Sequence, residues 1–293
     1  MQNPQTLSAP DVTHLSIAEI RQVFASISND KLPLHWLNGW LLAVIDQPSS
    51  FLITDGDFVP SIEQAKRLND GIVRMMAGEP LAYLVGSQGF WGRDFAVNAH
   101  TLIPRADTEI LIETVLRLYH DDKAASTPKI LDLGTGTGCI AITLAKELPS
   151  SQVWAVDFSD GALQVARANA KSLAADNCTL LQSDWYTAVT ERFDIIVSNP
   201  PYIDKTDAHL ADLHHEPISA LVADDAGLGD IMTIVTGAGA HLNAGGALLI
   251  EHGYDQGAAV RKIFEDAGFT QVATIQDYGG NDRMTMGFIK IIK

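Results

Sequence analysis

The stretch Ser198-Asn199-Pro200-Pro201-Tyr202 carries residue types that could do chemistry. The Asn199 side-chain oxygen and the Pro200 carbonyl can each accept a hydrogen bond, and the Tyr202 ring can pack on a planar group. Two consecutive prolines fix φ and hold the residue before each of them extended, so the acceptors point in set directions. This arrangement suits a flat, uncharged NH2 group. The alternative is a plain loop, because Asn-Pro starts turns readily.

An apolar strand has to position this stretch. Residues 193–197 form an apolar run that predicts a buried strand of a parallel sheet. The strand must end near Asn199, because the two prolines after it cannot donate hydrogen bonds to a sheet. Open α/β sheets bind their ligands at the carboxyl ends of the strands, so we expect Asn199 to face a binding crevice.

A glycine-rich loop upstream predicts a second part of the same site. The loop follows the predicted strand 129–133 and precedes a predicted helix, and it consists of Gly134, Thr135, Gly136, Thr137 and Gly138. Glycine lacks a Cβ atom and therefore lets a ligand approach the backbone closely. The spacing alone does not choose between cofactors. It is one residue shorter than the dinucleotide pattern Gly-x-Gly-x-x-Gly, and a nucleoside without phosphates has less need of that anion-binding geometry.

Acidic residues follow the next two predicted strands. Asp157 comes after the strand 153–156 and is placed to accept hydrogen bonds from a ribose diol. Asp184 and Trp185 come after the strand 178–182, where an acid and an aromatic ring could take an adenine amino group and cover a ring face. The alternative is that Trp185 is an ordinary core residue.

The composition and the net charge limit the kinds of partner and the cellular location that we expect for this protein. The chain has 293 residues and a net charge of −16, and it lacks the clustered Lys and Arg that grip a phosphate backbone. Nucleic acid is therefore disfavoured as the main partner. Cys139 and Cys178 show no metal or redox spacing, and no apolar run approaches membrane-spanning length. We expect a cytoplasmic protein with no membrane partner.

The front of the chain predicts a small helical bundle with helices over residues 14–27, 33–45 and 62–77. No catalytic constellation lies in this part, so docking of a partner is its expected role. Phe90-Trp91 and residues 95–97, separated by residues 92–94, predict a β-hairpin that connects two domains.

Residues 102–109 open a further predicted helix that runs to about Tyr119. Arg105, Asp107 and Glu109 are polar residues at its start. Acidic residues favour the first turn of a helix, so a solvated helix start is one interpretation. A role in shaping the cofactor pocket is the other.

The rest of the chain completes an α/β pattern. A long polar connection over residues 204–228 is expected to be a mobile lid. Its His209, His214, His215 and Glu216 are too irregularly placed to indicate a metal site, and we expect no metal. The later predicted elements are helices over 231–242 and 256–267 and strands over 247–251, 271–276 and 283–290, the last two as an antiparallel edge pair. His252 is expected to support the pocket rather than perform chemistry.

Taken together, these motifs resemble those of class I S-adenosylmethionine-dependent methyltransferases. They are residues 132–138, Asp157, residues 183–185 and the Asn199-Pro-Pro-Tyr202 signature of the amino-methylating branch. The sequence is most similar to the HemK/PrmC family of release-factor glutamine N5-methyltransferases, through residues 79–84, 90–91, 102–109 and 280–283 and the helical front domain. The resemblance covers nearly the whole chain. One departure is Ala106, where the family usually has a second proline.

The resemblance implies a Rossmann-like α/β fold with a mostly parallel seven-stranded sheet. It implies a helical substrate-docking domain over 1–86, a β-hairpin linker over 87–103 and a catalytic domain over 104–293. S-adenosylmethionine would be held by residues 134–138, Asp157, Asp184, Trp185 and Asn199. Asn199, Pro200, Pro201 and Tyr202 would hold the glutamine of the Gly-Gly-Gln loop of class 1 peptide chain release factors, with Asn199, Pro200 and Tyr202 as the catalytic residues.

Three alternatives remain at this point. The same chemistry could act on an adenine or guanine amino group of DNA or RNA, reached by base flipping. The excess of acidic over basic residues and the helical front domain argue against this alternative. A nicotinamide-dependent oxidoreductase would have a longer glycine loop and no Asn-Pro-Pro-Tyr after a strand. A non-catalytic binding module would not need the full set of cofactor-binding and substrate-binding residues that this sequence contains.

Overall fold

The computed structural model describes residues 9–121 and 127–290, and the chain divides into two compact units, residues 1–86 and 87–293. The first eight residues of the predicted front domain lie outside the described part. The predicted hairpin belongs to the second unit. Each unit has a hydrophobic core of its own.

The first unit is a bundle of short helices. They are α1 (Ile17–Ile27), α2 (Leu34–Ile45), α3 (Phe51–Thr54), α4 (Ile62–Met76) and α5 (Leu81–Val85). Ser16 and Ser61 start α1 and α4, and each forms a reciprocal capping box with the residue three positions on. Amphipathic spacing therefore located the long helices correctly. The four-residue helix α3 was not predicted, because so short a segment has no measurable period.

The second unit opens with the hairpin of β1 (Ser87–Phe90) and β2 (Arg93–Ala96). The predicted turn over residues 92–94 is wrong by one position. Trp91 and Gly92 form a two-residue turn, and both have positive φ, 50° and 67°. Such a turn matches the twist of two antiparallel strands, which a longer loop would not do as well.

A seven-stranded sheet forms the centre of the second unit. Its strands are β3 (Lys129–Leu133), β4 (Gln152–Asp157), β5 (Cys178–Gln182), β6 (Phe193–Ser198), β9 (Leu242–Glu251), β10 (Thr270–Gln276) and β11 (Asp282–Phe288). The order is β10-β11-β9-β6-β3-β4-β5, parallel except at β11. The predicted antiparallel pairing of the last two strands is confirmed. Of these two strands only β10 lies at an edge of the sheet, because β11 also pairs with β9.

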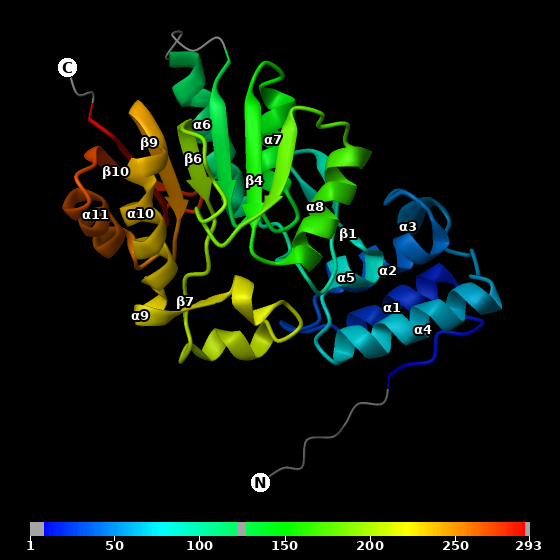
Figure 1. The fold of residues 1–293 in the computed structure, drawn as a ribbon. Coiled ribbons are helices and arrows are strands. Elements are labelled where there is room, and N and C mark those ends of the chain that lie inside the picture. The colour runs from blue at the N-terminus through cyan, green and yellow to red at the C-terminus, as the bar shows by residue number, and fades with distance from the viewer. Residues whose placement is uncertain (1–8, 122–126, 291–293) are drawn as a thin grey trace. The chain divides into compact units, whose positions relative to one another are not determined.

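Helices cover both faces of this sheet (Figure 1). They are η1 (Ala106–Thr108), α6 (Glu109–Asp121), α7 (Cys139–Glu147), α8 (Asp160–Ser172), α10 (Gly229–His241) and α11 (Gly257–Asp266). Apolar side chains of α6 and α7 pack on one face, and those of α10 and α11 pack on the other. The central strands β3 and β6 are consequently buried on both sides, which explains why their sequences are nearly continuous apolar runs.

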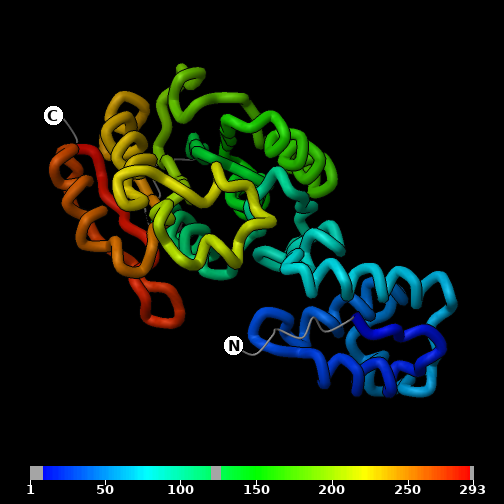
Figure 2. Tube along the Cα trace, turned by 90° about the horizontal axis from the view of Figure 1, so that it is seen from below, coloured from blue at the N-terminus to red at the C-terminus, as the bar shows by residue number. Residues whose placement is uncertain are grey.

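The predicted long connection after β6 contains short elements of its own. They are β7 (Ile203–Asp204), η2 (Ala208–Asp212), η3 (Ile218–Ala220), β8 (Val222–Ala223) and α9 (Asp224–Gly227), with β7 and β8 paired in parallel. In Figure 2 this yellow-green to yellow segment lies in front of the green strands. Its motion as a lid stays a prediction. Within residues 9–121 and 127–290, no helix is long and apolar enough to cross a membrane.

Candidate functional site

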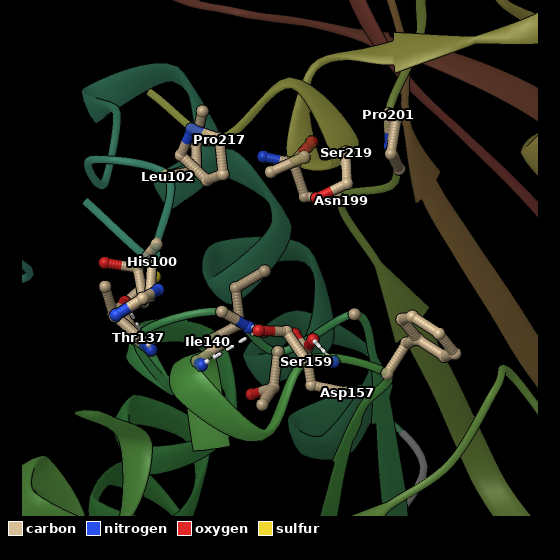
Figure 3. Close-up of a pocket in the computed structure, with 18 of the residues that line it drawn as sticks. His100, Leu102, Thr137, Ile140, Asp157, Ser159, Asn199, Pro201, Pro217 and Ser219 are labelled. Carbon is tan, nitrogen blue, oxygen red and sulfur yellow. Dashed lines mark hydrogen bonds between the residues drawn. The ribbon is translucent and has the colours of Figure 1, made fainter. Parts of the chain in front are cut away.

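A cavity of about 270 Å³ opens in the second unit at the carboxyl ends of the parallel strands. Of the residues singled out from the sequence, the cavity is lined by Arg105, Gly134, Thr135, Gly136, Thr137, Asp157, Asp184, Trp185, Asn199 and Pro201. Figure 3 shows two ends: Asp157 and Ser159 lie at one, and Asn199, Pro201 and Ser219 lie at the other. We call them the glycine-loop end (residues 134–137 and 157–159) and the Asn199 end (Thr108, Asn199, Pro201, Pro217, Ser219 and Ala220).

The register of the sheet brings the two ends together. Leu133 at the end of β3 lies directly beside Ser198 at the end of β6. The Ser198 hydroxyl donates to the Leu133 carbonyl at 2.7 Å, so the two strand ends are tied to one another. Asn199 and Gly134 therefore leave neighbouring strands at the same edge, as the sequence predicts.

The glycine loop is held by the backbone of the neighbouring strand. The amides of Gly134 and Thr135 both donate to the Val156 carbonyl at 2.9 Å. Gly138 lies where the loop becomes α7 and does not line the cavity. Its φ of 81° favours glycine there, and an added Cβ would also lie only 3.3 Å from the Cβ of Ala166.

Asp157 at the end of β4 fixes the free side of the loop. Its Oδ2 accepts from the Gly136 amide and its Oδ1 from the Ser159 amide, each at 2.8 Å (Figure 3). Burial raises the pKa of Asp157 above its ordinary value, and the two backbone hydrogen bonds oppose that rise. A carboxylate oxygen has more than one lone pair, so each oxygen can still accept from a ligand hydroxyl.

Trp185 forms a wall of the glycine-loop end. Its ring lies 3.4 Å from the position that a Cβ of Gly134 would take, and its own φ is +44°. Asp230 also lines the cavity, and burial raises its pKa while the neighbouring Trp185 side chain opposes the rise. Trp185 also packs against the core beneath α10, so both interpretations of this residue hold in part. Asp230 lines the cavity but was missed, because an acid in the first turn of a helix is an ordinary signal.

Residues 199–202 lie partly at the cavity and partly in the protein core. The Asn199 amide Nδ2 donates to the Thr108 hydroxyl at 3.2 Å. Pro201 lines the cavity, whereas Pro200 is buried and Tyr202 does not line it. The Tyr202 hydroxyl instead donates to Glu251 Oε1 at 3.3 Å, and burial raises the pKa of this tyrosine. The stacking of Tyr202 on a substrate group stays a prediction.

An ion pair with a buried carboxylate joins two segments of the cavity rim. The Glu216 side chain is 2% exposed, accepts from the Ile103 amide at 2.9 Å and pairs with the Arg105 guanidinium. Arg105 therefore shapes the pocket. Asp107 and Glu109 do not line it: Asp107 pairs with Arg283, and Glu109 accepts from the Trp91 amide.

The histidines singled out from the sequence lie away from the cavity. His252 is buried between the Gly253 carbonyl and the Thr285 hydroxyl, and burial lowers its pKa. Across the described residues, no group of three or more His, Cys, Asp or Glu side chains is arranged to hold a metal ion.

Comparison with known families and structures agrees with this geometry. The family model described as "Methyltransferase small domain" matches residues 106–277. The fold is similar to that of a crystal structure of a methyltransferase from Pyrococcus furiosus, with a TM-score of 0.52 at 18% identity over 76% of this chain and 99% of that one. The sheet order, the family model and this neighbour together show the class I methyltransferase fold.

Curated relatives narrow the family further. The release factor glutamine methyltransferase of Escherichia coli is 41% identical over 271 residues, which cover 92% of this chain and 96% of the relative. The release factor glutamine methyltransferase of Pseudomonas aeruginosa is 48% identical over 250 residues, which cover 84% of this chain and 89% of the relative. The enzyme of the same name from Aliivibrio fischeri is 43% identical over 251 residues, which cover 84% of this chain and 87% of the relative. The chain belongs to the family of release factor glutamine methyltransferases.

Proposed function

We propose that this chain transfers the methyl group of S-adenosylmethionine to the side-chain amide nitrogen N5 of a glutamine, the one in the Gly-Gly-Gln motif of a class 1 peptide chain release factor. Membership of the family supports this reaction. The observation that carries it is the position of Asn199, which shares one cavity with the glycine loop at the ends of two adjacent strands.

The residues of the cavity fit S-adenosylmethionine better than a dinucleotide. The acidic side chains that line it are Asp157, Asp184 and Asp230, and the Arg105 guanidinium there is already paired with Glu216. An acidic cavity favours a ligand with positively charged groups and disfavours a pyrophosphate. Asp157 would hold the ribose, Trp185 and Asp184 the adenine, and the loop backbone the remainder. When bound, the cofactor supplies a methyl group on a positively charged sulfur that leaves readily.

The chain's contribution to the chemistry is orientation of the acceptor nitrogen. An amide nitrogen is a poor nucleophile because its lone pair is delocalised into the carbonyl. Asn199, which lines the cavity, accepts a hydrogen bond from one N–H of this nitrogen through Oδ1. The carbonyl of Pro200, whose ring is buried, is the expected acceptor for the other N–H, and the two together favour a more pyramidal nitrogen and aim its lone pair. Orientation of this kind can remove a large share of a barrier. The nitrogen loses one proton to water as the new N–C bond replaces the S–C bond.

Docking of the protein substrate is assigned to the first unit. Its helices α1 to α5 carry none of the residues that line the cavity, and the unit is a compact body with its own core. A separate body suits recognition of a large substrate away from the reacting glutamine. Release factors act in translation, so the proposal places the enzyme in the cytoplasm.

Mapping of the methylated atom tests the proposal. The protein is incubated with methyl-labelled S-adenosylmethionine and a class 1 release factor, and in parallel with DNA and RNA, and the products are mapped by mass spectrometry. We expect the label on the glutamine of Gly-Gly-Gln, and none on a release factor in which that glutamine is replaced. Label on an adenine amino group with none on the release factor would overturn the proposal. The chain's net charge of −16 makes that second outcome the less favoured one.

A further inference from the structure

Gln256, the residue before α11, joins three segments of the second unit through one side chain. Its Nε2 donates to the Tyr202 carbonyl at 3.0 Å and to the Ala226 carbonyl at 3.3 Å. Its Oε1 accepts from the Gly253 amide at 2.8 Å. The NH2 group and the oxygen of the carboxamide therefore both have partners, which fixes the orientation of the side chain.

The backbone of Gly227 packs against the same Tyr202 carbonyl. A Cβ atom added to Gly227 would lie 2.1 Å from the Tyr202 oxygen and 2.8 Å from the Gln256 Nε2. Gly227 has a φ of 81°, and the two residues before it, Asp225 and Ala226, also have positive φ, 54° and 55°. Left-handed backbone is costly for residues other than glycine. The chain thus places a strained turn at this carbonyl.

The two prolines couple the Tyr202 carbonyl to the Pro200 carbonyl. The ring of Pro201 fixes its own φ and holds Pro200 extended, so few torsions between the two carbonyls are free to change. Neither proline has an N–H, so positions 200 and 201 cannot be held by backbone donors of their own. A contact that fixes the Tyr202 carbonyl therefore limits the directions open to the Pro200 carbonyl.

We propose that Gln256 is a positioning residue, which holds the Tyr202 carbonyl and thereby directs the Pro200 carbonyl toward the NH2 group of the substrate glutamine. This proposal rests on the proposed function, in which the Pro200 carbonyl is one of two acceptors for that group. Gln256 does not line the cavity, so it acts on the substrate only through the backbone of residues 200–202.

An isosteric substitution is the first test. In Q256E the side chain keeps its size and its bond from Gly253, but a carboxylate cannot donate to the two carbonyls. We expect kcat for release factor methylation to fall by about 10- to 100-fold, since a misplacement of about 1 Å can cost about 100-fold. The affinity for S-adenosylhomocysteine, measured by calorimetry, should stay within about twofold, because the glycine-loop end is a separate site.

Asn177 offers a matched control at the other edge of the sheet. It precedes β5, and its Nδ2 donates to the carbonyls of Ala145 and Ser151, each at 3.1 Å. N177D removes these donations in the same isosteric way and should lower the melting temperature by a similar amount. Its kcat should stay within about twofold of wild type at a temperature at which both variants are folded. Equal kcat in Q256E and N177D would overturn the proposal.

The second test reaches the same carbonyl through Gly227. In G227A the new methyl group meets the Tyr202 oxygen, so the carbonyl has to move. The matched control is G268A, because Gly268 has a similar φ of 85° and no described residue beyond its chain neighbours comes within 4 Å of an added Cβ. We expect kcat to fall by about 10-fold or more in G227A. A G227A enzyme as active as G268A would contradict the proposal.

Circular dichroism shows which variants fold before their rates are compared. If Q256E does not fold, Q256A decides the matter, because Gln256 is only half-buried and water can bond to the two carbonyls that lose their donor. Water does not fix the Tyr202 carbonyl, so kcat should still fall by about 10-fold, and an unchanged kcat overturns the proposal. A wild-type enzyme that leaves the release factor glutamine unmodified would instead refute the proposed function, which the wild-type assay detects separately.

Discussion

The two ends of the cavity are built in different ways. At the glycine-loop end, backbone amides bond to a strand carbonyl and to Asp157, and the residues come from two neighbouring strand–helix junctions. At the Asn199 end, side chains bond to groups far away in the sequence. Asn199 and Thr108 are 91 residues apart, and Glu216, the residue before Pro217 of this end, accepts from the Ile103 amide 113 residues away.

This difference determines what a single substitution can do. A site made of backbone groups tolerates changes of side chain except where glycine or an anchoring carboxylate is required. A site made of side chains loses an essential atom when one residue is shortened. We therefore expect substitutions at the glycine-loop end to act on cofactor affinity, and substitutions at the Asn199 end to act on turnover.

The largest effect is expected for Asn199→Ala. It removes one of the two acceptors for the glutamine NH2 and should lower kcat by about 100- to 1,000-fold, by analogy with the loss of one oxyanion-hole donor. Cofactor affinity should largely persist, because the glycine loop and Asp157 are untouched. The rate of release factor methylation is measured at saturating cofactor, and the affinity for the cofactor is measured in a separate titration. Near-normal turnover would remove the proposed role of Asn199.

Asp157→Ala should give the opposite pattern. It removes the proposed partner of the ribose diol and frees the Gly136 amide, which loosens the loop. Affinity for S-adenosylmethionine should fall by about 10- to 100-fold, since each hydrogen bond to a charged group is worth about 1.5–3 kcal/mol. At saturating cofactor the loss of kcat should be smaller than for Asn199→Ala.

The control for Asp157→Ala is Asp160→Ala. This variant removes an exposed acid nearby on α8, whose partners are Gln164 and Arg167. It should bind the cofactor normally. If both variants bind equally, Asp157 does not hold the cofactor, and the contrast between the two ends of the cavity disappears.

The same contrast explains what the sequence could and could not predict. The strands, the glycine loop and Asp157 are local patterns: an apolar run, glycines that follow it and an acid at the next strand end. Asn199 was predicted because its prolines and strand are also local. Thr108, Glu251 and Asp230 were not singled out as individual residues. Thr108 lies within the stretch 102–109 that carries the resemblance, but the residue types of all three are those of an ordinary helix start or strand end. Their roles depend on partners that only the folded sheet brings near.

A smaller effect is expected from the ion pair at the rim. Arg105→Ala leaves the buried Glu216 carboxylate with only the Ile103 amide as partner. Breaking a fully buried pair costs about 3–5 kcal/mol. Arg105 is 42% exposed, so solvent screens the charge and we expect a loss of about 1–2 kcal/mol in the free energy of unfolding. The segment 213–220 should also become more sensitive to limited proteolysis.

Arg93→Ala is the matched variant for this measurement. Its pair with Glu147 at 2.7 Å is more open to solvent on the carboxylate side, which is 32% exposed. Exposed pairs contribute about 0–1 kcal/mol. Denaturant unfolding of both variants should therefore separate them, and equal losses would show that burial of Glu216 has no special effect on stability.

The last prediction concerns the pH dependence of stability. Asp132 is fully buried in β3, with Thr135 as donor to one oxygen and no partner among the described residues for the other. Burial raises its pKa from 3.8 to about 7, so between these values the folded state binds a proton that the unfolded state lacks. Stability from this group is present below about pH 4 and is lost as the pH rises through about 7.

Replacement of Asp132 should therefore flatten the stability curve. Between pH 5 and 8.5 the melting temperature of wild type, relative to Asp132→Asn, should fall by an amount on the order of a few degrees. Asp277→Asn is the control, because the Asn281 amide holds the pKa of Asp277 below its ordinary value, and this carboxyl group titrates below the range measured. The melting temperature of Asp277→Asn should change with pH in parallel with that of wild type. A wild-type curve parallel to that of Asp132→Asn would mean that Asp132 is ionised across the whole range, and that burial beneath the glycine loop does not decide its charge.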